Sequence, residues 1–253
     1  MILFWVLPLM SKICFKKGIE SLWKQLSKKR WNDVLFTTPF WKFIAKTPNG
    51  RSVITKDYEP LVKDVMLENY KKNIWEEKIF INIWAHIWRW LIEFVSVYWY
   101  HWIAFEPSKE TFKYLRLNTI LSDIEWETQL FNFWLSNVSW ARNFKYIQEH
   151  DWHSHIISEN EQSDDTISIQ TKVFDELDLW INFDLVKLIM IDVEWHEYEV
   201  LQWMEKTLKR LHNIDIIVEV FDNDPNKEFV LTFMKTLWFS YKKITHADYI
   251  FCK

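Results

Sequence analysis

A chain of 253 residues is long enough for one large α/β domain, or for a domain with an N-terminal extension. Only 2 residues are glycine whereas 18 are tryptophan, and the formal net charge of -4 shows no basic excess that would favour nucleic acid as a partner. The two cysteines, Cys14 and Cys252, match no metal-ligand spacing, so we expect no metal site and a reducing, cytoplasmic location.

The first ten residues, MILFWVLPLM, are apolar, and basic residues follow from Lys12 to Lys17. This run is too short to span a bilayer and lacks the charged start of a secretory signal. We expect a buried helix or a peripheral contact with a membrane surface, and no stable membrane insertion.

Residues 1–75 are predicted to form a helical and hairpin lead-in, and residues 76–253 the main domain. In the lead-in, two alternating runs flank the turn tripeptide from Pro48 to Gly50, a pattern typical of a hairpin. The predicted elements are a basic helix, the two hairpin strands and a helix with periodic apolar residues, at 21–30, 40–47, 51–55 and 56–70.

From Lys78 onward, short apolar runs alternate with amphipathic helical patterns. The apolar runs of strand length cover residues 78–83, 102–106, 185–194 and 214–220. The helical patterns cover residues 90–99, 108–121 and 196–211. This alternation predicts an α/β fold with a doubly wound, mostly parallel sheet and right-handed crossovers.

Residues 126–176 interrupt the alternation with a more polar sequence that ends in the strand-like TISIQTKVF. We expect a β-rich insertion with a loop over the sheet edge. His153, Ser154 and His155 within it suggest a metal at first sight, but a His-x-His pair without a third ligand is a weak signal. An acceptor-binding loop is the better interpretation.

The tryptophan and glycine counts are unusual together. Average usage of about 7 per cent would give roughly 18 glycines in such a chain, which nearly equals the tryptophan count. Turns and helix C-caps need residues that accept positive φ, and glycine does so without steric cost. We therefore hypothesise that most tryptophans are glycine in the protein as made, because the codon UGA is read as tryptophan or, in some bacterial lineages, as glycine. The alternative is a genuinely tryptophan-rich protein that uses its rings to bind sugars or interfaces.

The stretch INIWAHIWRW lies directly after a predicted strand and before a predicted helix. With glycine at its first two tryptophans, it becomes a turn that lets the backbone approach a nucleotide-like ligand, where an indole would intrude. The cofactor-binding residues predicted for this turn are Asn82, Trp84, Ala85, His86 and Trp88.

The second predicted strand ends in Glu106 and Pro107, within WIAFEPS. In sheets of this class, an acid at the tip of the second strand accepts hydrogen bonds from both ribose hydroxyls of a nucleoside. We expect Glu106 and Pro107 to complete the cofactor site. The alternative is an exposed acid at a strand end, with no ligand.

Six segments follow one another in a fixed order: NIWAHIW at 82–88, AFEP at 104–107, FWLSN at 133–137, VFDEL at 173–177, MIDVEWHE at 190–197 and IVE at 217–219. In this order they resemble the motifs of the FkbM family of S-adenosylmethionine-dependent methyltransferases. The resemblance covers about residues 78–253, and every tryptophan inside a motif stands where the family has glycine. Two positions depart from the pattern, since Asn82 replaces an acid and Met190 replaces a lysine.

The resemblance implies a Rossmann-like class I fold and S-adenosylmethionine as cofactor. It also implies methyl transfer to a hydroxyl oxygen of a sugar, lipid or secondary metabolite, with a small-molecule or glycan acceptor as partner. Asp192, Glu194 and His196 follow a predicted strand, at the edge where open α/β sheets bind ligands. We expect Asp192 near the methyl group or acceptor, and Glu194 as an orienting group. His196 is the candidate base, and the alternative is a residue at a helix N-terminus that faces solvent. Glu219 could face the same cleft.

Two other functions remain open. A nicotinamide-dependent oxidoreductase would share the glycine turn and the ribose acid, but the turn is not G-x-G-x-x-G even with glycine restored. A non-catalytic binding protein on the same fold is favoured by Asn82, Met190 and literal tryptophans. With indoles at positions 84, 88 and 195 we expect the fold but no methyl transfer. The sequence sets no oligomeric state.

Overall fold

The computed structural model describes most of the chain from Glu59 to its end and two short strands before it. The described residues are 34–37, 42–45, 59–87, 89–137, 139, 141–145, 155–156 and 166–253. Several sequence predictions lie outside them, namely those for the apolar N-terminus, Cys14, the basic helix at 21–30, the hairpin turn with its second strand, Trp88, His153 and Ser154.

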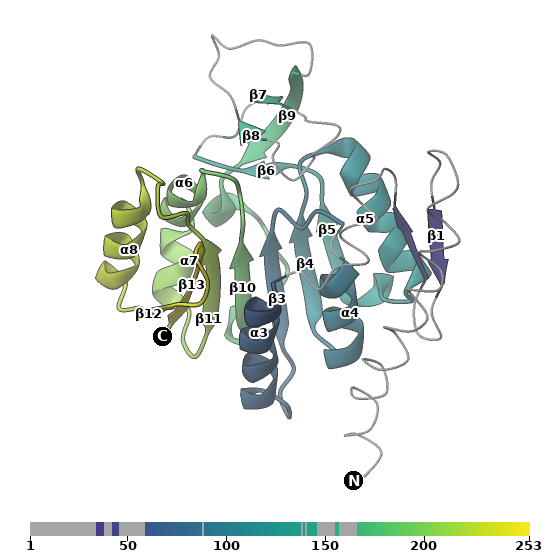
Figure 1. The fold of residues 1–253 in the computed structure, drawn as a ribbon, viewed down its shortest axis with the longest axis horizontal. Coiled ribbons are helices and arrows are strands. Elements are labelled where there is room, and N and C mark those ends of the chain that lie inside the picture. The colour runs from purple at the N-terminus through teal and green to yellow at the C-terminus, as the bar shows by residue number, and fades with distance from the viewer. Residues whose placement is uncertain are drawn as a thin grey trace.

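Seven strands form one sheet in the order β12-β13-β11-β10-β3-β4-β5 (Figure 1). Their bounds are β3 (Ile79–Ile83), β4 (His101–Phe105), β5 (Thr128–Phe131), β10 (Val186–Ile191), β11 (Asp215–Glu219), β12 (Ser240–Lys243) and β13 (Asp248–Cys252). β13 runs antiparallel to both neighbours, and the other pairs are parallel. This confirms the doubly wound, mostly parallel α/β sheet. The strand order reverses between β3 and β10, and such sheets bind ligands at that switch point, beyond the strands' carboxyl ends.

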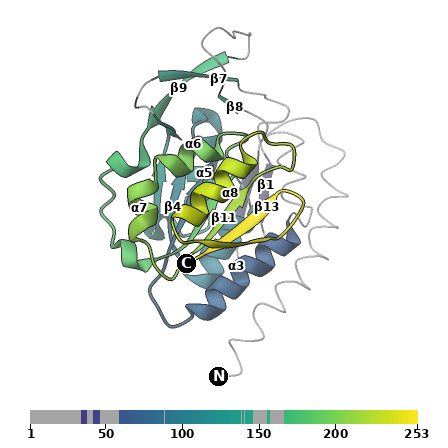
Figure 2. The same cartoon turned by 90° about the vertical axis from the view of Figure 1, so that its left-hand side faces the viewer.

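Helices cover both faces of the sheet. They are α3 (Pro60–Lys72), α4 (Arg89–Tyr98), α5 (Lys109–Leu121), α6 (Glu197–Gln202), α7 (Glu205–Arg210) and α8 (Lys227–Thr236). Residues of α3, α4 and α5 share one buried cluster, and residues of α6, α7 and α8 share another. Figure 2 shows α7 and α3 on opposite sides of β11. The central strands β3 and β10 are buried along their whole length, which explains their continuous apolar sequences.

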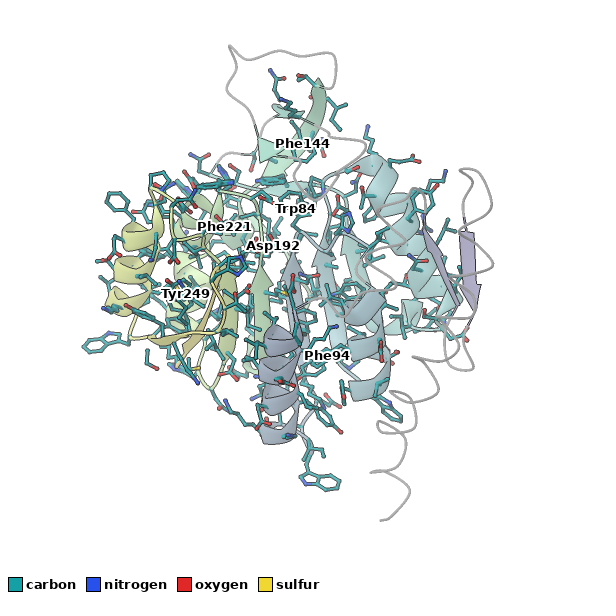
Figure 3. All side chains as sticks on the ribbon, viewed as in Figure 1. Trp84, Phe94, Phe144, Asp192, Phe221 and Tyr249 are labelled. Atoms are coloured by element: carbon teal, nitrogen blue, oxygen red, sulfur yellow. The ribbon has the colours of Figure 1, made fainter. Side chains whose placement is uncertain are left out.

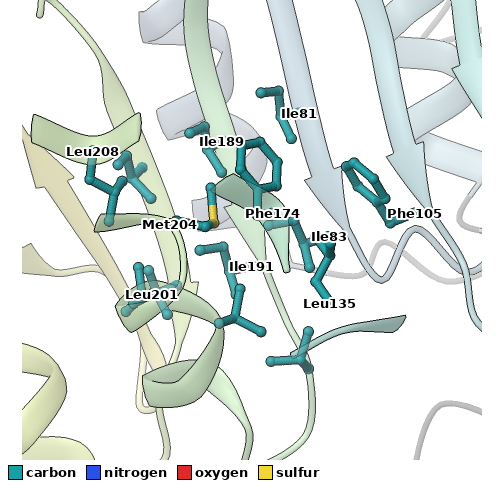
Figure 4. Packing of buried hydrophobic residues seen from close by; sticks show 14 of the residues in the cluster. Ile81, Ile83, Phe105, Leu135, Phe174, Ile189, Ile191, Leu201, Met204 and Leu208 are labelled. Atoms are coloured by element: carbon teal, nitrogen blue, oxygen red, sulfur yellow. The ribbon is translucent and has the colours of Figure 1, made fainter. Parts of the chain in front are cut away.

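Alternate residues of each central strand face opposite clusters. Ile81 and Ile83 of β3 belong to the cluster under α6 to α8, whereas Phe80 belongs to the cluster under α3 to α5. Figure 4 shows the first cluster, in which Ile189 and Ile191 of β10 lie among side chains of the other elements. The period of two therefore sends Asn82 toward the α3 side of the sheet, together with Phe80.

The segment 196–211 was expected to be one helix but forms two, α6 and α7. The backbone leaves the helical path at Trp203 and Met204, between the two helices. The carboxylate of Asp175 accepts hydrogen bonds from the backbone N–H groups of Lys206 (2.8 Å) and Thr207 (3.0 Å). These N–H groups lie in the first turn of α7, so Asp175 supplies a cap that the periodicity alone does not reveal.

A second sheet, in the order β6-β9-β7-β8, stands above the carboxyl ends of the main strands (Figure 1). Its strands are β6 (Trp134–Leu135), β7 (Ala141–Lys145), β8 (His155–Ile156) and β9 (Thr166–Lys172). The predicted β-rich insertion is thus confirmed, with one correction. The segment Thr128–Phe131 within it pairs with β4 and completes the main sheet.

The N-terminal elements differ in part from those expected. Strand β2 (Lys42–Ala45) falls where a strand was predicted, but its antiparallel partner is β1 (Val34–Thr37), which precedes it. Helix α3 lies close to its predicted position and packs on the sheet through Val62 and Met66. In the described part of the chain, no helix combines the length and apolar character needed to cross a membrane.

Asn69 joins α3 to the main domain. Its Nδ2 donates to the backbone oxygen of Lys187 (2.8 Å) and to Oδ2 of Asp215 (2.9 Å), and its Oδ1 accepts from the Tyr100 hydroxyl (2.7 Å). The predicted domain boundary between residues 75 and 76 stays a prediction. Helix α3 precedes this boundary but is hydrogen-bonded to residues that follow it.

Replacing Asn69 by alanine is expected to destabilise the whole domain. Each buried group that loses its partner costs about 1–3 kcal/mol in the free energy of unfolding. The neighbouring substitution Glu68→Ala removes an exposed side chain and should cost far less. Urea unfolding would measure both changes, and an N69A variant as stable as E68A would contradict a structural role for α3.

Candidate functional site

The turn after β3 has unusual backbone angles. Trp84 has a φ of 66° and His86 a φ of 46°, both in the left-handed region that favours glycine. Ala85 between them is fully buried, and its N–H donates to the backbone oxygen of Phe105 at the end of β4 (2.8 Å). The turn is thereby tied to the tip of the neighbouring strand. Trp88, the last predicted residue of this turn, lies outside the described residues.

Glu106 connects the turn to the start of α5. It is buried, its Oε2 accepts from the His86 N–H (2.9 Å), and its Oε1 accepts from the Ser108 N–H (2.8 Å). The predicted ribose acid is therefore no exposed strand-end residue. Pro107 is buried beside it, and its backbone oxygen accepts from Nδ2 of Asn132 (3.1 Å).

Two indoles occupy the space over the turn. Trp84 and Trp134 of β6 are both buried, and their ring centroids lie 5.2 Å apart. Figure 3 shows Trp84 near the carboxyl end of β3, below the inserted strands. The backbone geometry of a cofactor turn is present, but Trp84 places an indole where such a turn usually carries glycine.

Carboxylates converge at the switch point on the α3 side of the sheet. Asp192 and Glu194 follow β10, and Glu219 ends β11; each places one carboxylate oxygen within 4.8 Å of the others. Asp192 and Glu219 are hydrogen-bonded through their side chains. Glu59, at the start of α3, also faces Asp192. The sequence predicted that Asp192 and Glu194 lie at the same sheet edge, and they do. For Glu219 it offered the same cleft only as one option.

Burial and mutual repulsion raise the pKa of every acid in this group. Burial is the larger cause, and the charge of Asp192 adds to it, raising the pKa of Glu59 to about 8 and that of Glu194 to about 8. The same causes raise the pKa of Glu219 far above that of Asp192, whose own pKa burial also raises. The hydrogen bond between them favours the proton on Glu219 and the charge on Asp192.

His196 does not join these acids. Its Nε2 lies 3.0 Å from Oγ of Ser136, and its Nδ1 lies 3.7 Å from a carboxylate oxygen of Glu199. Its ring packs beside Trp134, with centroids 6.1 Å apart. The three predicted catalytic residues thus form two groups, one around Asp192 and one around His196. A sequence separation of four residues places side chains near each other in a helix, but here the intervening turn separates them.

That turn is the second place with left-handed backbone. Glu194 has a φ of 48° and Trp195 a φ of 75°. The indole of Trp195 is half exposed and stacks on Phe221, with centroids 5.7 Å apart. Two residues of the site were missed from the sequence. Ser136 lay inside the quoted FWLSN motif, and Glu59 gave no signal beyond its position before Pro60.

A cavity of about 510 Å³ lies at the base of the insertion. Its lining mixes polar or charged residues, such as Ser139, Lys172 and Glu176, with the apolar Val173 and Leu177. Among the described residues, none of those predicted to be catalytic or to bind the cofactor lines it.

Comparisons with known proteins give a family match and several distantly similar structures. The family model described as the methyltransferase FkbM domain matches residues 74–250. A search of curated proteins finds no match. Similar solved structures are the METTL16 MTase domain (9% identity, TM-score 0.46, covering 75% of this chain and 64% of that one) and M. jannaschii TYW2 in complex with AdoMet (10%, 0.43, 88% and 84%). A precorrin-6y C5,15-methyltransferase from Geobacter metallireducens is also similar (12%, 0.41, 78% and 91%).

This chain spans less than two thirds of the METTL16 domain. The TM-scores of these structures are low, so the description of the fold depends on the strand order alone. The family match carries the assignment. Since it spans well over half of the sequence, the chain belongs to the FkbM family of S-adenosylmethionine-dependent methyltransferases.

Proposed function

We propose that the protein methylates a hydroxyl oxygen of a small molecule or glycan. The observation that carries this proposal is the hydrogen-bonded pair of His196 and Ser136, which lies partly buried where the end of β6 meets the start of α6. A hydroxyl is a weak nucleophile while it keeps its proton, so an adjacent imidazole is the group such a reaction needs. The family's cofactor supplies the methyl group, and the chain must align the acceptor and take up its proton.

His196 is the proposed base. Its Nε2 would accept the acceptor's proton, and the nearby carboxylate of Glu199 would stabilise the imidazolium that forms. Ser136 orients the ring until the acceptor replaces it as hydrogen-bond partner. Asp192 supplies negative charge at the same edge and, in this proposal, attracts the positively charged cofactor, while Glu194, whose pKa is raised to about 8, orients it through hydrogen bonds.

The inserted sheet is the proposed acceptor-binding region. It stands above the sheet edge that carries the site, and the cavity at its base offers hydroxyl and carboxylate groups beside apolar ones. The net charge of -4 supports a neutral or cationic acceptor rather than nucleic acid. A cytoplasmic location is part of the same proposal.

A labelled-methyl assay tests the acceptor class. The protein purified from cells in which its gene is native would be incubated with methyl-labelled S-adenosylmethionine and, separately, with glycans, lipid alcohols, small phenols and total RNA. Label in an ether bond of a hydroxylated small molecule or glycan is the expected result. Label only in RNA, or only on nitrogen, would overturn the proposed acceptor.

A further inference from the structure

The mismatch between a glycine-type backbone and tryptophan side chains extends far beyond the cofactor turn. Nine residues other than glycine have positive φ in the described part of the chain, and four of them are tryptophan. Their φ values are 66° at Trp84, 58° at Trp99, 75° at Trp195 and 69° at Trp238. A bulky aromatic residue in this region is a true outlier, whereas Asn, Asp and His tolerate it.

The end of α8 shows the mismatch most clearly. The Phe239 N–H donates to the backbone oxygen of Met234 (3.1 Å), and the Trp238 N–H donates to that of Lys235 (3.0 Å). This pair of bonds is a Schellman motif, and Trp238 occupies its left-handed position, where glycine is the usual residue. Helix α5 ends in the same motif, but there Asp123 occupies that position.

Side-chain environments support the same conclusion. Tryptophan is normally well buried, and its N–H finds a hydrogen-bond partner when it is. Here five indoles are almost fully exposed: Trp75 (94%), Trp99 (81%), Trp126 (88%), Trp180 (88%) and Trp238 (86%). Conversely, the indole nitrogens of Trp102 and Trp134 are buried with no hydrogen-bond partner. Neither a fully exposed position nor a buried position without a hydrogen-bond acceptor is a typical environment for tryptophan.

We infer that Trp84, Trp99, Trp195 and Trp238 stand at positions occupied by glycine in the protein made by its native host. Backbone angles carry this inference, and they are independent of the composition that first suggested it. Trp134 joins the set because its indole lies against that of Trp84 over the cofactor turn. The inference deepens the proposed function, since it opens the cleft that the function needs.

Peptide masses test the residue identity directly. Trypsin cuts after Lys and Arg, so the segment from Ile79 to Arg89 carries positions 84 and 88 in one peptide, and the segment from Thr236 to Lys242 carries position 238. In protein from the native host, both peptides are expected to have the masses of the glycine forms. Tryptophan masses would overturn the inference. Methyl transfer plays no part in this measurement, so its outcome is separate from that of the acceptor assay.

A stability comparison adds a second test. Trp238→Gly is expected to raise the Tm by roughly 2–4 °C, because it removes left-handed strain at an exposed site. Trp180→Gly is the matched control, since Trp180 is equally exposed but is not among the residues with positive φ. It should leave the Tm unchanged or lower it. Equal effects of the two substitutions would count against the strain argument.

A second inference comes from the carboxylates and is independent of the tryptophans. We propose that Glu219 is a positioning residue that holds a proton and donates it to Asp192, so that Asp192 carries the single charge facing the cofactor turn. Three carboxylates within 4.8 Å cannot all be ionised without a compensating cation or a shared proton. The direct hydrogen bond between Asp192 and Glu219 requires a proton between their oxygens, which favours the second solution.

Other charged groups surround this pair on each packed element. They are Glu59 and Lys63 of α3, His86 in the turn after β3, Glu194 after β10, and Asp248 of β13 with His246 beside it. Acids outnumber bases among them, so a second negative charge on Glu219 would be strongly opposed.

The raised pKa values of these acids in the folded state make the stability of the protein depend on pH. Their contribution to stability is complete below the unfolded pKa, near 4, and is lost as the pH rises through the folded values.

The Tm of the unmodified protein should therefore fall between about pH 5 and about pH 8.5, on the order of 3 °C per pH unit for each acid that keeps its proton. Glu219→Gln keeps a hydrogen-bond donor but cannot ionise, so it should flatten this slope and raise the Tm at the higher pH. Glu228→Gln, an exposed acid at the start of α8, is the control and should change neither.

Infrared spectra give a further readout. The carbonyl stretch of a protonated carboxyl should be present in the unmodified protein at about pH 8.5 and weaker in E219Q. An unchanged slope and spectrum in E219Q would overturn the proposal. So would a rise of several degrees in the Tm of the unmodified protein on adding magnesium or manganese, because the cation would then take the place of the proton.

Discussion

A chain with glycine at positions 84, 88, 134 and 195 is expected to bind S-adenosylmethionine, whereas the chain with tryptophan there binds none. The physical reason is steric. Trp84 and Trp134 are buried against each other over the cofactor turn, and Trp195 crowds the turn after β10. Glycine removes these indoles and leaves the backbone angles and the buried Glu106 as they are.

Titration calorimetry would measure this change, with the shift in Tm as a second readout. A ligand present at a hundred times its Kd adds about 2.7 kcal/mol to the free energy of unfolding, and hence roughly 5–10 °C to the Tm of a domain this size. A control chain with glycine at Trp75, Trp126, Trp180 and Trp203 changes as many residues outside the two turns and should gain no binding. Tight binding by the tryptophan chain would refute the steric argument.

In the glycine-bearing enzyme, His196→Gln should lower kcat by about 10²–10⁴-fold, which is the usual contribution of a general base. Glutamine can still hydrogen-bond Ser136 but cannot accept a proton at neutral pH. The Kd for the cofactor should change little, because the proposed role of His196 is to accept a proton from the acceptor. The limb of the pH profile of kcat that a general base produces should also disappear.

Ser136→Ala is the matched control for this experiment. It removes the partner that orients His196 but keeps the imidazole, so a smaller loss of kcat with an intact pH profile is expected. An H196Q enzyme with unchanged kcat would exclude His196 as the base. The acids around Asp192 would then be the remaining candidates.

The fold was predictable because it depends on local apolar patterns. The runs that became β3, β4, β10 and β11 are continuous and of strand length, and amphipathic helices separate them, so the parallel sheet followed. The division of 196–211 into two helices was not predictable. It depends on Asp175, which is distant in sequence and caps α7 through side-chain hydrogen bonds.

The site was predictable only where a motif ends a strand. Asp192 and Glu194 follow β10 directly, so the sheet itself brings them to the switch point. The Ser136 contact with His196 joins residues 60 apart, and Glu59 reaches the acids from a helix assigned to the lead-in. No periodicity encodes such contacts, because they arise when separate elements pack. Composition suggested glycine at most tryptophan positions without saying which, and positive φ occurs at Trp84, Trp99, Trp195 and Trp238.

The two hydrogen bonds that Glu106 accepts have a kinetic consequence. Each carboxylate oxygen accepts one backbone N–H, from His86 and from Ser108. The loop is therefore already locked in shape by the same group that would meet the ribose. Binding of a nucleoside would then lose little free energy to ordering of the loop. Association should therefore be rapid and single-phase in a chain that lacks the indoles over the turn.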